Sequence, residues 1–353
     1  MKIITTYLMF IIISFVFFIG CSSDKQKWYR GNTHAHTVIC GHADSTPEFV
    51  TAWYHSHGYN FLILSEHNHF IDPDTVKKPT ELDNEFILIP GEEVTGKKII
   101  HTTAMNINKI VDWKSESENK TDIIQYHVDG TIEAGGQAIL NHPNYKYAVG
   151  ASDIIDVENL YMFELYNGHP KVNNEGDENH LSTEEIWDSL LTAGMKIYGV
   201  ASDDAHHFHT IDSAHSNPGR GWVMVNALEL TPAAITNAMT DGKFYASSGV
   251  FLEELTVTSD YIKIIIDEVK TTEQISKENM NGRSSTDSTN EFSLEFIGDG
   301  GKIIKTINSS SATYNFDKSQ KYIRAKIIVR RNNRFGAIEE FYAWTQPVFF
   351  DGR

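Results

Sequence analysis

Histidine and carboxylate residues recur in this sequence where short apolar runs end. Two pairs have members two residues apart, His34 with His36 and Asp204 with His206. Residues i and i+2 of an extended strand point to the same face, so both members of a pair can reach one ion. Neutral imidazoles and carboxylates are ligands that zinc, manganese and iron accept in proteins. The two pairs therefore predict a site for divalent metal.

Further ionisable residues follow other apolar runs of the chain. These candidates are His42, Glu66, His67, Glu93, His101 and His142. A carboxylate such as Glu93 can bridge two ions, and a cluster of this size predicts two or three divalent ions (Zn, Mn or Fe). A single histidine is more often a solvated or core residue, and His207 beside the second pair is left open. The solvated interpretation is given to His55, His57, His127, His180, His209 and His215.

Only two cysteines are present, Cys21 and Cys40. If Cys21 is lipidated, Cys40 has no partner, and neither a disulfide framework nor a thiolate zinc site is expected. The predicted metals are therefore held by nitrogen and oxygen.

The elements that must position these ligands alternate between strands and helices from residue 28 to 249. Helices are predicted to open at Ser45–Glu48, Ser182–Glu185 and Thr231–Pro232, and to end at Gly58, Gly194 and Gly242. Strands are predicted over 28–33, 61–64, 86–90, 99–106, 137–141, 160–166, 196–201 and 221–226. Such alternation predicts a largely parallel sheet, closed or open. The ligand candidates then lie at the carboxyl ends of the strands, where such folds build their sites.

After Gly249 the pattern changes to strands with little helical periodicity between them. Strands are predicted over 252–258, 261–266, 291–296, 322–330 and 339–345, with a long surface loop over 267–290. Residues 250–353 are therefore expected to form a small all-β, sandwich-like domain that accompanies the first.

The N-terminus carries the features of a secretory signal. Lys2 precedes an apolar run from Ile3 to Ile19, and Gly20 is followed directly by Cys21. This arrangement resembles a bacterial lipobox and predicts a signal peptide over 1–20, lipidation of Cys21 and a tether over 21–27. The alternative is an uncleaved membrane anchor. Either form places the rest of the chain at the cell envelope, on its periplasmic or surface face, with the membrane as a partner.

The composition is that of a folded protein, with 41% hydrophobic and 22% charged residues among 353. The formal net charge is −17, with 47 acidic and 30 basic residues. Such a charge repels phosphate backbones, so stable binding of duplex nucleic acid is not expected.

Five stretches of the first 249 residues resemble the polymerase-and-histidinol-phosphatase (PHP) superfamily of metallohydrolases, and the stretch around Asp44–Glu48 resembles its carbaryl-esterase-like branch. The matching stretches are Asn32–Thr37, Gly58–Asn68, Gly91–Glu93, Asn141–Pro143 and Ser202–His206. The resemblance implies an α/β fold, a distorted barrel of seven β/α units over residues 28–249.

The resemblance also implies a ligand set. The first metal would take His34, His36, Glu93 and Asp204, and Glu93 would bridge to a second ion held by His101 and His142. A third would take His42, His67 and His206. The chain departs from the family at Glu66, where Asp is usual, and at Cys40–Asp44, so His42 and Asp44 both remain candidates for the third site. Asp204 is preferred to Asp203 because it keeps the spacing to His206.

A metal-dependent phosphoesterase is the expected activity. A hydroxide that bridges two metals would attack a phosphomonoester or nucleotide-like phosphate, with Asp204, Glu93 and His206 at the catalytic centre. Arg220, in a Gly-rich loop, is the candidate cation for the phosphate, or else a surface turn residue. Hydrolysis of a carboxyl or carbamate ester is the alternative. An envelope lipoprotein that binds a glycan or peptide over a relic metal site is a third.

Overall fold

The computed structural model describes residues 26–77, 85–277, 289–333 and 336–350. These residues form a mixed α/β fold with three sheets. The expected signal peptide and the lipidation site Cys21 lie outside the described residues. In the ranges given above, no helix combines the length and the apolar character that a bilayer crossing requires.

The largest sheet has ten strands, ordered β14-β13-β16-β17-β10-β9-β1-β2-β3, with β18 paired to β16. Its N-terminal members are β1 (Lys27–Ala35), β2 (Phe61–Leu64), β3 (Ile87–Leu88), β9 (Trp222–Ala227) and β10 (Phe244–Ser247). Its C-terminal members are β13 (Glu291–Gly298), β14 (Lys302–Ile307), β16 (Tyr322–Asn332), β17 (Ile338–Thr345) and β18 (Val348–Phe349). Only the β1–β2 and β2–β3 pairs of this sheet are parallel.

A second sheet of five strands lies beside the first. It is ordered β4-β5-β6-β7-β8 and consists of β4 (Gly91–Thr95), β5 (His101–Met105), β6 (Gln137–Leu140), β7 (Met162–Asn167) and β8 (Tyr198–Ser202). Strands β6, β7 and β8 run parallel, but β4, β5 and β6 pair antiparallel. The expected largely parallel sheet is thus mixed, because the short turn between β4 and β5 allows only an antiparallel neighbour.

The two sheets meet through single bridges at the strand ends. Ala35 bridges Ala205, and His67 bridges Glu93. The backbone amide of His36 donates to the carbonyl of Ala205 at 2.9 Å, and that of Asn68 to Glu93 at 2.9 Å. These contacts bring the ends of β1, β2, β4 and β8 together. A closed barrel of seven β/α units is not confirmed, since the described residues contain six α-helices, one of them C-terminal.

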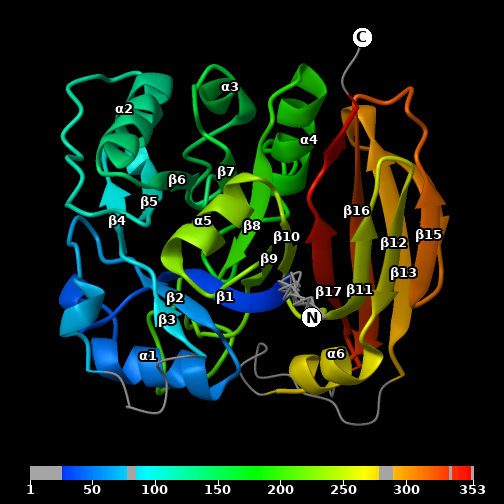
Figure 1. Cartoon of the computed structure of the whole chain (residues 1–353), viewed down its shortest axis with the longest axis horizontal. Coiled ribbons are helices and arrows are strands. Elements are labelled where there is room, and N and C mark those ends of the chain that lie inside the picture. The colour runs from blue at the N-terminus through cyan, green and yellow to red at the C-terminus, as the bar shows by residue number, and fades with distance from the viewer. Residues whose placement is uncertain (1–25, 78–84, 278–288, 334–335, 351–353) are drawn as a thin grey trace, which may run out of the picture.

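The helices pack on the outside of the sheets. They are α1 (Pro47–Ser56), α2 (Lys120–Glu133), α3 (Ala151–Ile154), α4 (Thr183–Ala193), α5 (Pro232–Thr240) and α6 (Glu268–Ile275). The predicted α4 signals are confirmed: Ser182 and Glu185 form a capping box, and Gly194 ends the helix in the left-handed conformation. Helices α2, α3 and α4 form a row (Figure 1) over a core that includes Leu140 and Phe163.

The C-terminal strands form the other end of the molecule (Figure 1). A three-stranded sheet of β11 (Leu252–Val257), β12 (Tyr261–Ile266) and β15 (Ser311–Asn315) packs on the extension of the large sheet. Ile264, Phe296 and Val329 belong to their shared core. The expected surface loop after β12 instead begins with α6, because the side chain of Asp267 caps its first turn.

The C-terminal strands are continuous with the rest of the fold across Gly249. Strand β17 pairs with β10, so that Tyr245 lies opposite Thr345. The guanidinium of Arg324 on β16 is buried and lies 2.7 Å from Asp188 and 3.2 Å from Glu184, both on α4. The side-chain amide of Gln346 exchanges two 2.9 Å hydrogen bonds with the backbone of Gly199. The two parts therefore share one sheet and a buried ion cluster.

Candidate metal centre

Glu93 lies at the centre of the cluster of ionisable residues. Its carboxylate is buried, and Oε1 lies 3.3 Å from Nε2 of His34, 3.2 Å from Nε2 of His142 and 3.1 Å from Nδ1 of His101. Oε2 lies 2.7 Å from Nδ1 of His67. Four strand ends far apart in the sequence thus converge on one carboxylate.

The pair at the end of β1 faces both acidic residues. The Nε2 atoms of His34 and His36 are 3.1 Å apart, which confirms that the two-residue spacing places both on one face. Oδ1 of Asp204 lies 3.5 Å from His34 Nε2 and 3.4 Å from His36 Nε2. His36 Nε2 is also 3.6 Å from Glu93 Oε2. These side chains present one ligand atom each within 4.8 Å of the others in the groups His34–His36–Asp204 and His34–Glu93–His142.

A further group of imidazoles lies nearer the surface. His42, His67 and His206 offer ligand atoms within 4.8 Å of one another. The ring of His42 stacks on His206 with centroids 4.6 Å apart and on His67 at 5.3 Å. Asp44, the other candidate here, instead accepts hydrogen bonds from the backbone amides of Phe208 and His209 at 3.0 and 3.2 Å. The structure brings His42 into the cluster and leaves Asp44 outside it.

Cys40 lies closer to the histidines than the sequence analysis allowed. Its thiol is within 4.8 Å of the ligand atoms of His36 and His206. It is a free, half-buried cysteine, so a sulfur ligand is available beside the nitrogen and oxygen ligands.

The histidines are held by hydrogen bonds that set which nitrogen carries the proton. Nδ1 of His42 lies 3.0 Å from the carbonyl of Cys40, and Nδ1 of His206 lies 2.9 Å from that of Asp204. A carbonyl only accepts, so the proton is on Nδ1 and the lone pair is on Nε2. Nδ1 of His34 likewise faces the carboxylate of Glu164 at 2.8 Å. Such outer contacts are the usual support of metal-binding imidazoles.

A direct test of whether a metal fits is given by His206. Its Nε2 is buried and has no hydrogen-bond partner among the described residues. Burial, aided by His36, lowers the pKa of His206 to about 2, so the ring is neutral. A buried, neutral and unpartnered nitrogen is costly unless it binds an ion. The donor set therefore fits a divalent metal of the zinc, manganese or iron type.

The two central carboxylates are ionised. Burial would raise the pKa of Glu93, but the charges of His101 and His34 hold it well below its usual range. Burial opposes ionisation of Asp204 too, and His34 and His36 again keep its pKa well below normal. The site thus holds two anionic groups, whose charges favour the binding of divalent cations.

The backbone at the site is strained. His142 and Asp204 adopt positive φ values of 25° and 49°, and so does Asn68, next to His67, at 49°. Left-handed conformations of such residues cost about 1–3 kcal/mol and persist where surrounding contacts enforce them. The turns that follow β2, β6 and β8 therefore direct their side chains inward.

Glu164 and Asn167 on β7 support the site and were not predicted. Oε1 of Glu164 accepts from His34 and from the hydroxyl of Ser202, and Oε2 accepts from the backbone amide of His142 at 2.7 Å. Asn167 donates to Glu164 at 2.8 Å and to Asp204 at 3.3 Å. The available signal was a charged residue within the apolar run 160–166.

Three acidic or basic candidates have structural roles instead. Asp203 accepts from the hydroxyl of Tyr54 and from the backbone amides of residues 219, 220 and 221, at 2.6 to 2.8 Å. Glu66 accepts from the amide of Thr37 at 2.7 Å. The guanidinium of Arg220 is buried and donates to the carbonyl of His215 at 2.6 Å and the side chain of Asn217 at 2.6 Å. This guanidinium holds its own loop together, and its role toward a phosphate stays a prediction.

A cavity of about 390 Å³ opens over the cluster. Its lining consists of His42, His67, Glu93, His101, His142, Tyr145, His169, Lys171, Asp204, His206 and His207. Tyr145, His169 and Lys171 were not predicted, and His207 is now placed at the cavity. His127, expected to be solvated, is fully buried on α2 and has its pKa lowered by burial to about 4.

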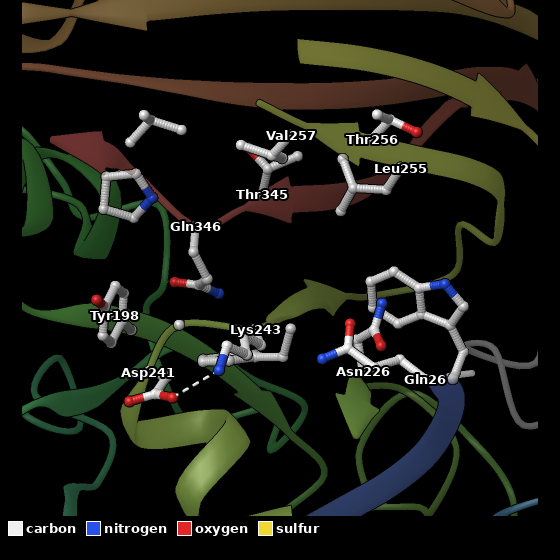
Figure 2. Close-up of a pocket in the computed structure, with 15 residues that line it drawn as sticks. Gln26, Tyr198, Asn226, Asp241, Lys243, Leu255, Thr256, Val257, Thr345 and Gln346 are labelled. Carbon is white, nitrogen blue, oxygen red and sulfur yellow. Dashed lines mark hydrogen bonds and ion pairs between the residues drawn. The ribbon is translucent and has the colours of Figure 1, made fainter. Parts of the chain in front are cut away.

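A second cavity of about 550 Å³ lies between the two parts of the fold (Figure 2). Asp241 and Lys243 form a 2.7 Å ion pair on its wall, and no histidine lines it. It lacks the ligand cluster and is not the centre predicted by the sequence.

No protein-family model matches the chain, and no curated protein matches it. Among solved structures it is similar to a two-domain protein from Bacteroides vulgatus, described as containing a predicted PHP-like metal-dependent phosphoesterase. That likeness covers 93% of this chain and 88% of the other, at 13% identity and a TM-score of 0.46. Such a remote likeness assigns no activity, so function must be argued from the side chains of the site.

Proposed function

We propose that this protein is a metal-dependent hydrolase of the PHP type, with a distorted β/α barrel around the site, and that it cleaves phosphate esters. The observation that carries the proposal is the convergence of five histidines on buried Glu93, beside ionised Asp204. A structural ion pair needs only one partner for a carboxylate, whereas several imidazoles around shared carboxylates are the donor set of a multinuclear metal centre.

The proposed ligands extend the three groups described above, because Glu93 lies 3.6 Å from His36 and 3.1 Å from His101 and can be shared between two ions. One ion would be held by His34, His36, Glu93 and Asp204, and a second by Glu93, His101 and His142. A third would be held by His42, His67 and His206. When bound, divalent ions lower the pKa of a water molecule and neutralise oxygens of the substrate.

The chain's own residues prepare the site for that chemistry. Glu164 fixes the proton of His34 on Nδ1 and positions the backbone of His142. The carbonyl of Asp204 does the same for His206. Fixed imidazoles and buried carboxylates cost no reorganisation when a substrate arrives, which is the usual source of electrostatic catalysis.

The decisive experiment is turnover of three 4-nitrophenyl substrates, a phosphomonoester, a phosphodiester and an acetate. Residues 22–353 would be assayed with manganese or zinc, with a chelator control and a Glu93→Gln variant. Turnover of a phosphate ester that both changes abolish supports the proposal. Turnover of the acetate alone would contradict phosphate-ester cleavage and favour hydrolysis of a carboxyl or carbamate ester. Metal binding without turnover of any substrate would favour a binding role.

The proposal extends to the whole chain. Residues 1–20 would be a signal peptide, Cys21 a lipid attachment site and residues 250–353 an accessory domain of the envelope-anchored enzyme. A Cys21→Ser variant should then move from the membrane fraction to the soluble fraction. Retention of this variant in the membrane would favour the uncleaved anchor.

A further inference from the structure

The cavity wall contains side chains that none of the three ligand groups uses. Seven lining residues belong to those groups, and the others are Tyr145, His169, Lys171 and His207. Lys171 is the one lysine or arginine among the described lining residues. It is exposed at the cavity and forms no ion pair with any described residue, although the chain has a net charge of −17.

The loop that carries Lys171 is fixed to the metal centre. Asn167 donates to Asp204 and accepts from the backbone amide of His169 at 2.8 Å. Asn174 closes the loop by exchanging hydrogen bonds with the backbone of Asn167 at 2.9 and 3.1 Å. A Cβ at Gly168 would lie 2.9 Å from the Cβ of Arg220, so only glycine lets the loop approach this closely. The backbone that leads to Lys171 is thus held in place by the residue that also contacts Asp204.

His169 presents a donor on the same wall. Its Nδ1 accepts from the backbone amide of Lys171 at 3.1 Å, so the proton of the neutral ring is on Nε2. The ring is half-buried and stands edge-on to His206, with centroids 6.0 Å apart. An N–H and an ammonium therefore lie two residues apart at the cavity, and both can only donate from these atoms.

A neighbouring turn adds to this surface. Tyr145 forms a backbone bridge with Val172, and its ring lines the cavity with its centroid 6.3 Å from that of the His169 ring. The ammonium of Lys146 lies 5.4 Å from the centroid of that ring. Lys171 at the cavity and Lys146 beside the ring of Tyr145 therefore place positive charge near this wall, which would attract an anion.

We propose that His169 and Lys171 form a phosphate-recognition subsite that makes the enzyme selective for phosphomonoesters. The inference rests on the proposed function and names its substrate class. A phosphomonoester has three non-bridging oxygens and a double negative charge, so it can use an ammonium and an N–H in addition to metals. A neutral carboxyl ester offers no such charge.

The test compares Lys171→Ala, Lys171→Arg and a matched control, Lys243→Ala, whose lysine lines the cavity of Figure 2. KM and kcat are measured with 4-nitrophenyl phosphate and 4-nitrophenyl acetate, and binding of inorganic phosphate to the metal-loaded protein is measured by calorimetry. Lys171→Ala should weaken phosphate binding and raise KM for the phosphate ester about tenfold to hundredfold. KM and kcat for the acetate should not change in Lys171→Ala. Lys171→Arg should recover most of the lost phosphate affinity, and Lys243→Ala should match the wild type.

His169 is tested by His169→Gln, which keeps a donor near the position of Nε2, and His169→Phe, which removes it. The first should retain more phosphate affinity than the second. Metal-loaded wild type that does not bind phosphate, or Lys171→Ala that binds it as well as wild type does, would overturn the subsite. Chelator-sensitive phosphoesterase turnover that is unaltered in the Lys171 variants would overturn the subsite and leave the proposed function intact. Loss of the proposed function instead appears as wild-type turnover of acetate alone.

Discussion

Oε1 of Glu164 lies 2.8 Å from Nδ1 of His34, and both side chains are shielded from solvent. The contact joins a residue in the interior of β7 to the candidate ligand at the end of β1. Burial opposes the charge of Glu164, yet the electrostatic interaction and the hydrogen bond with His34 lower the pKa of this carboxyl below its ordinary value. The pair is an ionised carboxylate that orients an imidazole, an arrangement found behind many metal-binding histidines.

Glu164→Gln should therefore weaken metal binding without removing a ligand. We expect metal affinity to fall about tenfold to hundredfold, the range for loss of such an outer partner. Competition with a coloured chelator measures it, and the exposed Glu158→Gln serves as the control. Unchanged affinity in Glu164→Gln would mean that His34 does not depend on this contact.

Asp203→Asn and Asp204→Asn should affect different properties, stability and metal content, although the residues are adjacent. The carboxylate of Asp203 accepts hydrogen bonds from backbone amides and from the hydroxyl of Tyr54. In Asp203→Asn an NH2 group would replace one accepting oxygen and lie against these donors, so the free energy of unfolding should fall by about 1–3 kcal/mol. Asp204→Asn should instead lower the metal content by about one ion per chain, because an amide is a poor ligand for these ions. Urea unfolding and elemental analysis separate the two. Metal loss in the Asp203 variant would show that the assignment is reversed.

His42→Ala should remove only the outermost ion. His42 reaches the cluster through the stacked rings of His67 and His206, whereas Asp44 holds backbone amides. We expect the metal content of His42→Ala to fall by about one ion, with the other ions retained. Asp44→Ala should keep the full content and melt at a lower temperature. The two variants are compared by elemental analysis and thermal unfolding, and metal loss in Asp44→Ala alone would contradict the placement of His42.

Acid should loosen the contact between α4 and β16. Burial disfavours the charge of Glu184, but Arg324 and Lys326 keep its pKa below the ordinary value of 4.5. A carboxyl with a lowered folded-state pKa stabilises the fold above its unfolded pKa, and this contribution is lost as pH falls through the folded value. Glu184→Gln should therefore be less stable at neutral pH and lose less stability between neutral pH and about pH 3.

The measurement for this prediction is the free energy of unfolding in urea across that pH range. Exposed Glu178→Gln is the control, and it should follow the wild-type curve. Parallel curves for Glu184→Gln and the wild type would show that Glu184 does not contribute to acid sensitivity.

Much of the fold was predictable where an apolar run is flanked by polar residues on both sides. The predicted strands 61–64 and 261–266 coincide with β2 and β12. Strand β4 was missed because two buried carboxylates, Glu92 and Glu93, occupy its middle and break the apolar pattern. Helix α2 was missed because polar His127 and Thr131 take buried positions on its inner face. In both cases tertiary contacts override local preference.

The candidate ligands were predictable because strand periodicity and strand ends are local properties. The spacing argument holds for His34 and His36, which lie at the end of β1 with their Nε2 atoms 3.1 Å apart. Asp204 and His206 follow the end of β8 and fall in different groups, and the set of His34, His36, Glu93 and Asp204 was implied by the family resemblance. The contact of Glu164 with His34, and the position of His169 and Lys171 at the cavity, depend on which strands become neighbours. A local sequence pattern does not specify strand order, so these features could not be predicted. Arg220 was chosen because it lies in a Gly-rich loop before a strand, and the carbonyls around its guanidinium could only be known from the folded loop.

The pairing of Tyr245 with Thr345, and of Trp28 with Asn226, has a consequence for how the protein reaches its native state. Strand β1 lies in the middle of the large sheet, but its neighbour β9 is synthesised much later than β1. Strand β17, which pairs with β10, is likewise synthesised much later than β10. Long loops must close before these strands gain partners, and such non-local topologies fold slowly. The chain should therefore pass through a prolonged stage in which the edges of β1 and β10 are unpaired. During that stage the nascent protein would be most prone to aggregation and most dependent on chaperones.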